Sequence, residues 1–355
     1  MNNFQLKIFQ EVNKSNINKN MMISPLSIYH ILSLTANGAA NKTLAEMLKA
    51  LCNKDFKEMN KENKLISSCL GKYKSTELAN AVFVKFKPED SFIKMTKGYK
   101  AKIDILKDVN QINSWCSNTT HNKIPKIIDV IKENDLMVLI NAIYFKGIWK
   151  KTFDKKRTIK NNFNNLNKNP KKVDFMNSTE KYDYIEINGV QVISLNYQKD
   201  NMKALIILPK REDDINIFID NFKLEKYNEI IKNLKNVKVE LYLPKFEVNF
   251  EVELKSSFIS MGMVEAFSDN ADFSGMNKNK ILKIGRIIHK NFIKVDEEGT
   301  EAAAGTAVVM RCLDYTSTPE KIYFMNVNRP FLFIIRTNDL PPGHDILFIT
   351  KVESL

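Results

Sequence analysis

Cysteine is scarce in this chain of 355 residues, which contains four: Cys52, Cys69, Cys116 and Cys312. None of them stands in a C-x-x-C pair, so the sequence indicates neither a structural zinc site nor a dithiol redox motif. Widely scattered thiols are typical of a protein in a reducing compartment, and one or two disulfides stay open as an alternative. We expect no metal ion and no cofactor.

Long apolar runs are also missing. No run reaches the ~18 residues of a membrane-spanning helix. The first residues, MNNFQLKIFQEVNKSN, lack the charged start, the apolar stretch and the small-residue cleavage site of a signal peptide. We therefore expect no membrane contact and a cytoplasmic location, or secretion by a route without a cleavable signal peptide.

Catalytic motifs are absent as well. The four histidines are His30, His121, His289 and His344, and the chain has no H-E-x-x-H, G-x-S-x-G or Walker-type phosphate loop. Cys116 lies close to His121 in sequence, so a cysteine hydrolase is one hypothesis. The competing interpretation, which we favour, is that Cys116 packs as a small core residue on an amphipathic helix. The sequence predicts that the protein is not an enzyme.

Acidic residues are outnumbered by basic ones, 41 against 54, which gives a net charge of +13. Such a charge attracts polyanions, glycosaminoglycans among them. Basic residues cluster at 150–160 and 168–172, without interleaved aromatic residues suited to base stacking. The abundance of asparagine beside lysine favours a solvated basic surface, so a polyanion or glycosaminoglycan partner is a weak alternative.

Helical and strand patterns intermix along the chain, and no repeat or Pro/Gly/Ser-rich linker divides it. Apolar residues recur at helical spacing from Phe4 to Val12, and Ser24 and Pro25 predict the cap and first turn of a second helix. Residues 136–145, LMVLINAIYF, read as a strand buried on both faces. The mixture lacks βαβ regularity and predicts one large α+β domain over residues 1–355.

The segment Val295–Met310, VDEEGTEAAAGTAVVM, combines two opposed tendencies. Every second residue from Thr300 onward is uncharged, which is the period of a strand with one buried face. Alanine and glycine nevertheless favour strands little. We interpret the segment as a mobile piece that enters a sheet, and a surface helix followed by a loop is the alternative.

Several motifs follow one another along the chain: MISPLSI at 22–28, LINAIYFKGIW at 139–149, LPKF at 243–246, the stretch 254–275, HK at 289–290, the segment 295–304 and NRPFLF at 328–333. Together and in this order they resemble the motifs of the serpins, in particular the intracellular, ovalbumin-like serine-protease inhibitors. The resemblance implies an α+β serpin fold with three β-sheets, eight to nine helices and an exposed reactive-centre loop. It also implies a monomer, with the hinge and the loop at residues 296–320.

The function that the resemblance implies is suicide-substrate inhibition of a serine protease. The protease cleaves the exposed loop, and the loop inserts into the central sheet before the acyl-enzyme is hydrolysed. Gly299 is expected to supply backbone freedom at the turning point, and small inward residues to ease entry. A non-inhibitory serpin with a binding or chaperone-like role is the alternative. The implied hinge residues are Glu298, Gly299, Thr300, Glu301, Ala302, Ala303, Ala304 and Thr306.

The family register places the reactive bond between Leu313 and Asp314. A leucine suits the apolar pocket of a chymotrypsin-like or cathepsin-G-like protease. Other cleavage positions stay open: Arg311 would suit a trypsin-like protease, Tyr315 a chymotrypsin-like one, and Asp314 a caspase-like or granzyme-B-like one.

Four further residues, Ser24, Ser27, Asn141 and His289, match the polar cluster that the family places beneath its central sheet, where two strands part. We name them the shutter cluster. Buried polar groups must bond to one another, since each unpaired group costs about 1–3 kcal/mol. We interpret the cluster as a gate that is remade during insertion, and plain satisfaction of core polar groups is the competing interpretation.

Overall fold

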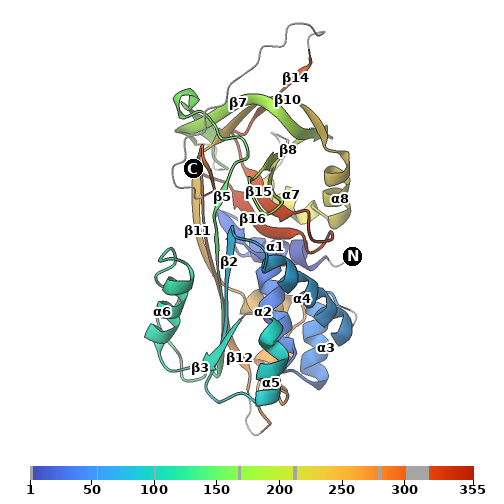
Figure 1. The fold of residues 1–355 in the computed structure, drawn as a ribbon, viewed down its shortest axis with the longest axis vertical. Helices are drawn as coiled ribbons and strands as arrows, with labels where there is room; N and C mark the ends of the chain where they lie inside the picture. The colour runs from blue at the N-terminus through green and yellow to red at the C-terminus, as the bar shows by residue number, and fades with distance from the viewer. Residues whose placement is uncertain are drawn as a thin grey trace.

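Nine α-helices and two β-sheets form the described part of the chain in the computed structural model (Figure 1). This mixture confirms the predicted α+β class. None of the helices within the described ranges has the length and apolar character needed to cross a bilayer. The described residues are 3–53, 55–99, 101–166, 169–210, 214–278, 282–300 and 320–355.

Helices fill most of the N-terminal part of the chain. α1 (Phe4–Lys14) buries the apolar face that its periodicity predicted. α2 (Pro25–Ala36) is buried at every position, as expected of a helix inside a core. The other helices are α3 (Asn41–Ala50), α4 (Phe56–Leu70), α5 (Asp90–Thr96), α6 (Val109–Thr119), α7 (Ile215–Asn221), α8 (Leu224–Asn233) and α9 (Lys255–Ser260), with 3-10 turns η1 (Lys97–Tyr99), η2 (Lys155–Arg157) and η3 (Glu265–Phe267).

The start of α2 departs from the sequence prediction in one respect. Pro25 occupies the first turn, where a helix needs no N–H, as predicted. Ser24 stands at the N-cap with extended backbone angles, but its side chain makes no capping hydrogen bond. The prediction that the Ser24 side chain caps α2 is therefore wrong. The backbone N–H of Ser24 donates instead to His289 Nε2 of the central sheet.

The central sheet has its strands in the order β3-β2-β4-β12-β13-β5, and β11 pairs with β12 as well. Its long strands run along the molecule, with α6 on one side and α2 to α5 on the other (Figure 1). β4 and β12 pair in parallel from Ile284 and Met137 to Phe292 and Tyr144. We call this junction the seam. The strands are β2 (Thr76–Val84), β3 (Lys102–Ile105), β4 (Met137–Phe145), β5 (Gly147–Ile148), β11 (Phe246–Glu253), β12 (Ile284–Val295) and β13 (Gly299–Thr300).

The second sheet has the order β1-β16-β15-β9-β8-β7-β10-β14, with β6 paired to β7. The resemblance implied three sheets, but the described residues form two. Two groups of strands join into this one sheet because the 18-residue β7 pairs with β8 at one end and with β10 over residues 175–184. The strands are β1 (Met21–Ile23), β6 (Ile159–Asn164), β7 (Pro170–Ile187), β8 (Val190–Asn196), β9 (Met202–Leu208), β10 (Lys235–Pro244), β14 (Ile322–Asn326), β15 (Phe331–Thr337) and β16 (Ile346–Val352).

β4 is buried on both faces, which confirms the prediction from its unbroken apolar run. Leu139 and Ile143 belong to the large core on the α2 side. Val138 and Ile140 belong to a smaller core that also contains Cys116 of α6. The seam is thus covered by packed side chains on both faces of the central sheet.

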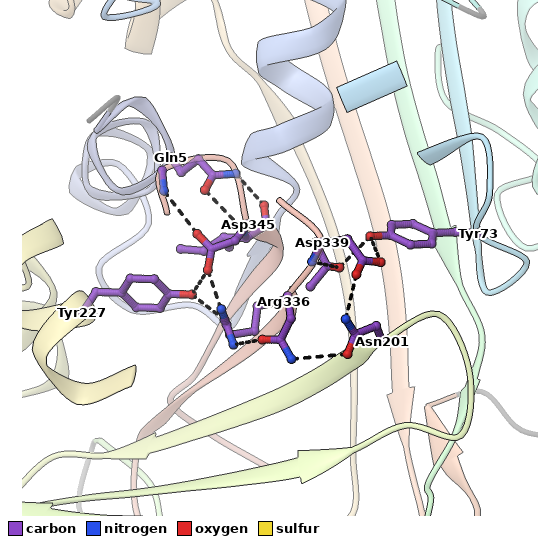
Figure 2. Close-up of polar contacts among 11 residues, drawn as sticks. Gln5, Tyr73, Asn201, Tyr227, Arg336, Asp339 and Asp345 are labelled. Carbon is purple, nitrogen blue, oxygen red and sulfur yellow. Dashed lines mark hydrogen bonds and ion pairs between the residues drawn. The ribbon is translucent and has the colours of Figure 1, made fainter. Parts of the chain in front are cut away.

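A buried polar network ties α8 to the hairpin of β15 and β16 (Figure 2). Asp345 Oδ2 accepts hydrogen bonds from the Tyr227 hydroxyl at 2.5 Å and from Arg336 Nε at 3.0 Å. Gln5 of α1 joins by accepting the backbone N–H of Ile346 at 3.1 Å. The Asp345 and Arg336 charges are therefore paired and hydrogen-bonded, as buried charges must be.

Candidate functional site

The shutter cluster lies across the seam, where Asn141 of β4 and His289 of β12 are direct partners in the ladder. Both side chains are fully buried. The Ser24 backbone N–H donates to His289 Nε2 at 3.0 Å. Since Nε2 accepts, Nδ1 carries the proton and donates to Asn141 Oδ1. Burial lowers the pKa of His289 to about 3, so the ring is neutral at physiological pH.

Asn141 extends the network from the seam toward α2. Its Nδ2 donates to Ser27 Oγ and to Asn80 Oδ1, and the Ser27 hydroxyl also donates to Asn80 Oδ1, at 3.1 Å. All four predicted residues therefore meet, although Ser24 takes part through its backbone N–H.

Two members of this network were missed by the sequence analysis. Asn80 of β2 supplies the acceptor that Asn141 and Ser27 share. Asn291 donates to the Met22 carbonyl at 3.0 Å and lies against His289 Nε2. A signal existed for Asn291, since residues two apart on a strand face the same side. Asn80 stands alone as a polar residue in the apolar run ANAVFV, which marks a buried polar position.

The hinge begins inside the central sheet. β13 pairs antiparallel with β12, Thr300 opposite Val295, and with β5, Gly299 opposite Ile148. Thr300 is fully buried, and its hydroxyl is 2.7 Å from that of Tyr197. The expectation that this segment is exposed before cleavage is therefore wrong for Gly299 and Thr300, because β12 and β5 leave a two-residue slot between them at the top of the seam.

Glycine is needed at position 299 because the backbones of β13 and β5 approach each other closely, more than for the backbone freedom that glycine supplies. A Cβ atom at this position would lie 2.0 Å from the carbonyl oxygen of Gly147, and 2.8 Å from Ile148 Cα. Gly147 is equally restricted, since its own Cβ would lie 2.6 Å from the Tyr197 ring. Gly299 therefore lets the backbone of β13 approach that of β5, while Gly147, opposite Thr300, leaves room for the rings of Tyr197 and Phe145.

The acidic residues before the hinge are held by specific partners. Glu297 is 3% exposed, accepts a hydrogen bond from Thr158 at 2.7 Å and pairs with Lys245 at 3.1 Å. Burial alone would raise the pKa of Glu297, but these partners outweigh it and hold the pKa below its ordinary value. Glu298 pairs with Lys155 of η2. The bend between β12 and β13 is thus fixed on both sides.

The remaining predicted site residues lie outside the described part of the chain. These are the hinge residues Glu301, Ala302, Ala303, Ala304 and Thr306, the reactive-bond residues Leu313 and Asp314, and the alternatives Arg311 and Tyr315.

The cysteine-hydrolase hypothesis is not supported by the surroundings of Cys116. Its side chain is fully buried in the core beneath α6, and burial raises the pKa of the thiol to about 12. A nucleophilic cysteine needs a lowered pKa, since the thiolate is the reactive form. His121 is exposed. The packing interpretation of Cys116 is confirmed.

A family model described as serpin (serine protease inhibitor) matches residues 1–355. The chain belongs to the serpin family. It is 32% identical to the leukocyte elastase inhibitor of Xenopus tropicalis, over 99% of this chain and 97% of that protein. It is 30% identical to serpin B3 of Homo sapiens, with the same shares covered. Among solved structures it is similar to the native state of the thermophilic serpin tengpin, with a TM-score of 0.88, 33% identity, and 99% of this chain and 92% of that one covered.

In this serpin the seam of the central sheet is closed below the hinge. β4 and β12 bond directly to each other along eight register pairs, which leaves no strand between them over that length. Above those pairs, β13 lies between Val295 of β12 and the two residues of β5. The site is therefore a closed pair of strands with the first two residues of a third strand already at its upper end.

Proposed function

We propose that this serpin is a suicide-substrate inhibitor of a serine protease. The protease cleaves the reactive-centre loop and forms an acyl-enzyme, and the loop inserts between β4 and β12 before that ester is hydrolysed. The observation that carries the proposal is the position of β13, antiparallel to both β12 and β5 at the upper end of the seam. The hinge thus occupies the start of the path that an inserting strand would follow.

The burial of Thr300 supports the proposed inward register. Alternate residues of a strand face the same side of a sheet. A strand that continues from Thr300 would turn Ala302, Ala304 and Thr306 toward the buried side, and Glu301 away from it. The small uncharged side chains would enter the core, which keeps the steric and desolvation barriers to insertion low.

Insertion would replace one parallel strand pair by two antiparallel pairs. The seam offers eight register positions, and an inserted strand gains ladder partners on both sides. Each such hydrogen bond contributes about 0.5–1.5 kcal/mol net, so the inserted form is favoured by several kcal/mol before side-chain burial is counted. The intact loop is tied to β13 at one end and to β14 at the other, so insertion would wait for cleavage.

We propose Leu313–Asp314 as the reactive bond and a chymotrypsin-like or cathepsin-G-like protease as the target. The name of the Xenopus tropicalis relative, leukocyte elastase inhibitor, adds leukocyte elastase to the proteases to be tested. Cleavage after Arg311 would indicate a trypsin-like target, and cleavage after Asp314 a caspase-like or granzyme-B-like one.

A glycosaminoglycan or other polyanion partner is supported less well. Three lysines of the basic cluster at 150–160 are paired with carboxylates on neighbouring elements, which favours an ion-paired, solvated surface. The pairs are Lys151–Glu180, Lys155–Glu298 and Lys160–Asp174.

The test is incubation with chymotrypsin, cathepsin G, leukocyte elastase, trypsin and granzyme B, followed by denaturing electrophoresis and mass spectrometry. We expect a complex of the combined mass that survives SDS with at least one of the first two proteases. The released C-terminal peptide should begin at Asp314. If every protease only cleaves the loop and is released active, the inhibitor proposal fails and the non-inhibitory alternative replaces it.

A further inference from the structure

An apolar patch lies exposed on β14, which stands at the edge of the second sheet, at the top of Figure 1. Ile322 is 50% exposed and Phe324 is 56% exposed. Residues two apart on a strand face the same side of a sheet, so both side chains stand on one face. The Phe324 ring meets that of Tyr242 on β10, with the ring centroids 5.9 Å apart. We call Ile322, Phe324 and Tyr242 the strand patch.

The strand patch is held in a fixed position by its surroundings. β14 pairs in parallel with β10 along five register positions. The Phe324 carbonyl accepts a hydrogen bond from Gln191 Nε2 of β8 at 2.9 Å. Tyr323 packs against Tyr184 of β7, with ring centroids 5.3 Å apart. A surface that is already ordered loses little conformational freedom when a partner binds, which favours docking of a folded protein.

The place of the strand patch in the chain indicates which protein docks there. The expected reactive bond, Leu313–Asp314, ends eight residues before Ile322. Eight residues of extended chain span at most about 29 Å. A chymotrypsin-like domain of about 230 residues has a radius of gyration of about 17 Å, so its width exceeds the length of this tether. The protease surface beside the cleft that holds the bond is therefore within reach of β14.

Lysines border the strand patch. Lys238 of β10 stands opposite Ile322. Lys181 of β7 stands opposite Lys238 in the neighbouring ladder, and it is paired with Glu320 at 3.1 Å. An exposed aromatic and an exposed aliphatic side chain beside ammonium groups fit a protein surface that carries an apolar residue next to a carboxylate. The apolar centre of the patch favours such a surface over a polyanion.

We propose that the strand patch is a second docking site for the target protease. The proposal rests on the inhibitory function proposed above, since its occupant is the protease engaged on the reactive-centre loop. Ile322 and Phe324 would contact an apolar residue beside the cleft of the protease, and Lys238 would pair with a neighbouring carboxylate. The contact forms before cleavage, so it raises the rate of protease capture and selects among proteases that accept the same scissile residue. It leaves insertion unaltered, because β14 lies outside the central sheet.

The test compares the Ile322→Thr/Phe324→Thr variant with the unchanged protein against the five proteases named above. Threonine suits a strand and removes the apolar surface. With the protease that attacks the loop fastest, we expect the rate of attack to fall about tenfold, the loss usual for aromatic anchors of an interface. The matched control is Val264→Thr, which changes a 50%-exposed residue at the start of η3 and should leave the rate unchanged. Both variants should keep the melting temperature, as exposed substitutions usually do.

The rate of attack counts complex and cleaved loop together, so it can be measured whether or not the serpin inhibits. The ratio of complex to cleaved loop reports insertion and should be the same in the double variant. A protease whose catalytic serine is replaced by alanine docks without cleaving, and its Kd for the double variant should be about tenfold higher. Lys238→Gln should slow attack about threefold at low salt and leave it unchanged at high salt, because salt screens the pair.

The proposal is overturned if the double variant is attacked as fast as the unchanged protein and binds the inactive protease as tightly. It is also overturned if sedimentation shows a dimer that the double variant dissociates, because a second copy of the chain would then occupy the strand patch. An unchanged protein that yields only cleaved loop would contradict inhibition, while the rate and the Kd would still decide whether the protease docks on β14.

Discussion

If this serpin inhibits proteases as proposed, replacing Thr300 by arginine should convert it into a substrate. Thr300 is fully buried between β12 and β5, and its hydroxyl is hydrogen-bonded to that of Tyr197. An arginine here would bring a guanidinium against the stacked rings of Trp149 and Tyr197, whose centroids are 4.5 Å apart. No carboxylate is described as a partner of Thr300, so the new charge would be buried without compensation.

The size of the effect follows from comparing the free-energy cost of burying the arginine charge with the stabilisation of β13. The effective penalty for burying an unpaired ion is several kcal/mol. β13 is held by a few ladder hydrogen bonds and the bond to Tyr197, each contributing about 0.5–1.5 kcal/mol. The charge penalty equals or exceeds the whole stabilisation of β13. If even about 3 kcal/mol of it appears in the barrier to insertion, insertion slows by about two orders of magnitude and hydrolysis of the acyl-enzyme prevails.

The assay is the yield of SDS-stable complex per cleaved inhibitor, with whichever protease forms a complex with the unchanged protein. Thr300→Val is the matched control, because it keeps the shape and introduces no charge. It leaves the Tyr197 hydroxyl unpaired, at a cost of about 1–3 kcal/mol, and should retain most of the complex. A Thr300→Arg variant that forms complex with undiminished yield would refute the proposed register and the insertion path.

Three further predictions follow from the same site. Gly299→Ala should release β13, since its Cβ would lie 2.0 Å from Gly147 O; amide exchange at Thr300 should then become fast, and continued protection would contradict the close approach. Asn141→Ala should lower the free energy of unfolding in urea by about 2–4 kcal/mol, because the His289 Nδ1–H loses its acceptor and a cavity is left; a change below about 0.5 kcal/mol would count against the network. In the folded protein the pKa is about 4 for His30 and about 3 for His289, both below the ordinary 6.5. The free energy of unfolding should therefore be highest above pH 6.5 and should fall as the pH drops below it. Each histidine contributes a slope of about 1.4 kcal/mol per pH unit, since the unfolded chain binds the proton first; urea midpoints that stay flat between neutral and mildly acidic pH would show that these rings are not buried neutral.

Much of the fold was predictable because its signals are local. The unbroken apolar run of β4 indicated burial on both faces, and the structure places a core on each side of it. The helical spacing of α1 and the proline at the start of α2 were equally direct. The shared sheet formed through β7 was not predicted, because its continuity depends on how far one strand extends beyond its partners.

The candidate site was predictable in its members but not in its geometry. The resemblance brought Asn141 and His289 together, which lie 148 residues apart in the chain and bond to each other in the seam. Thr300 and Tyr197 lie 103 residues apart, and no sequence pattern predicts the contact between them. The burial of Gly299 and Thr300 depends on the space between β12 and β5. That space exists only once both strands are placed in the sheet, so no local sequence pattern predicts it.

The most direct test of loop insertion is thermal melting of the intact protein and of the protein cleaved once within residues 301–319. In the proposed mechanism cleavage frees the loop to enter the seam. The cleaved form should then melt at a sharply higher temperature, because an added central strand would give both β4 and β12 a new antiparallel partner. A cleaved form that melts at or below the temperature of the intact protein would contradict insertion and leave the position of β13 without the role proposed for it.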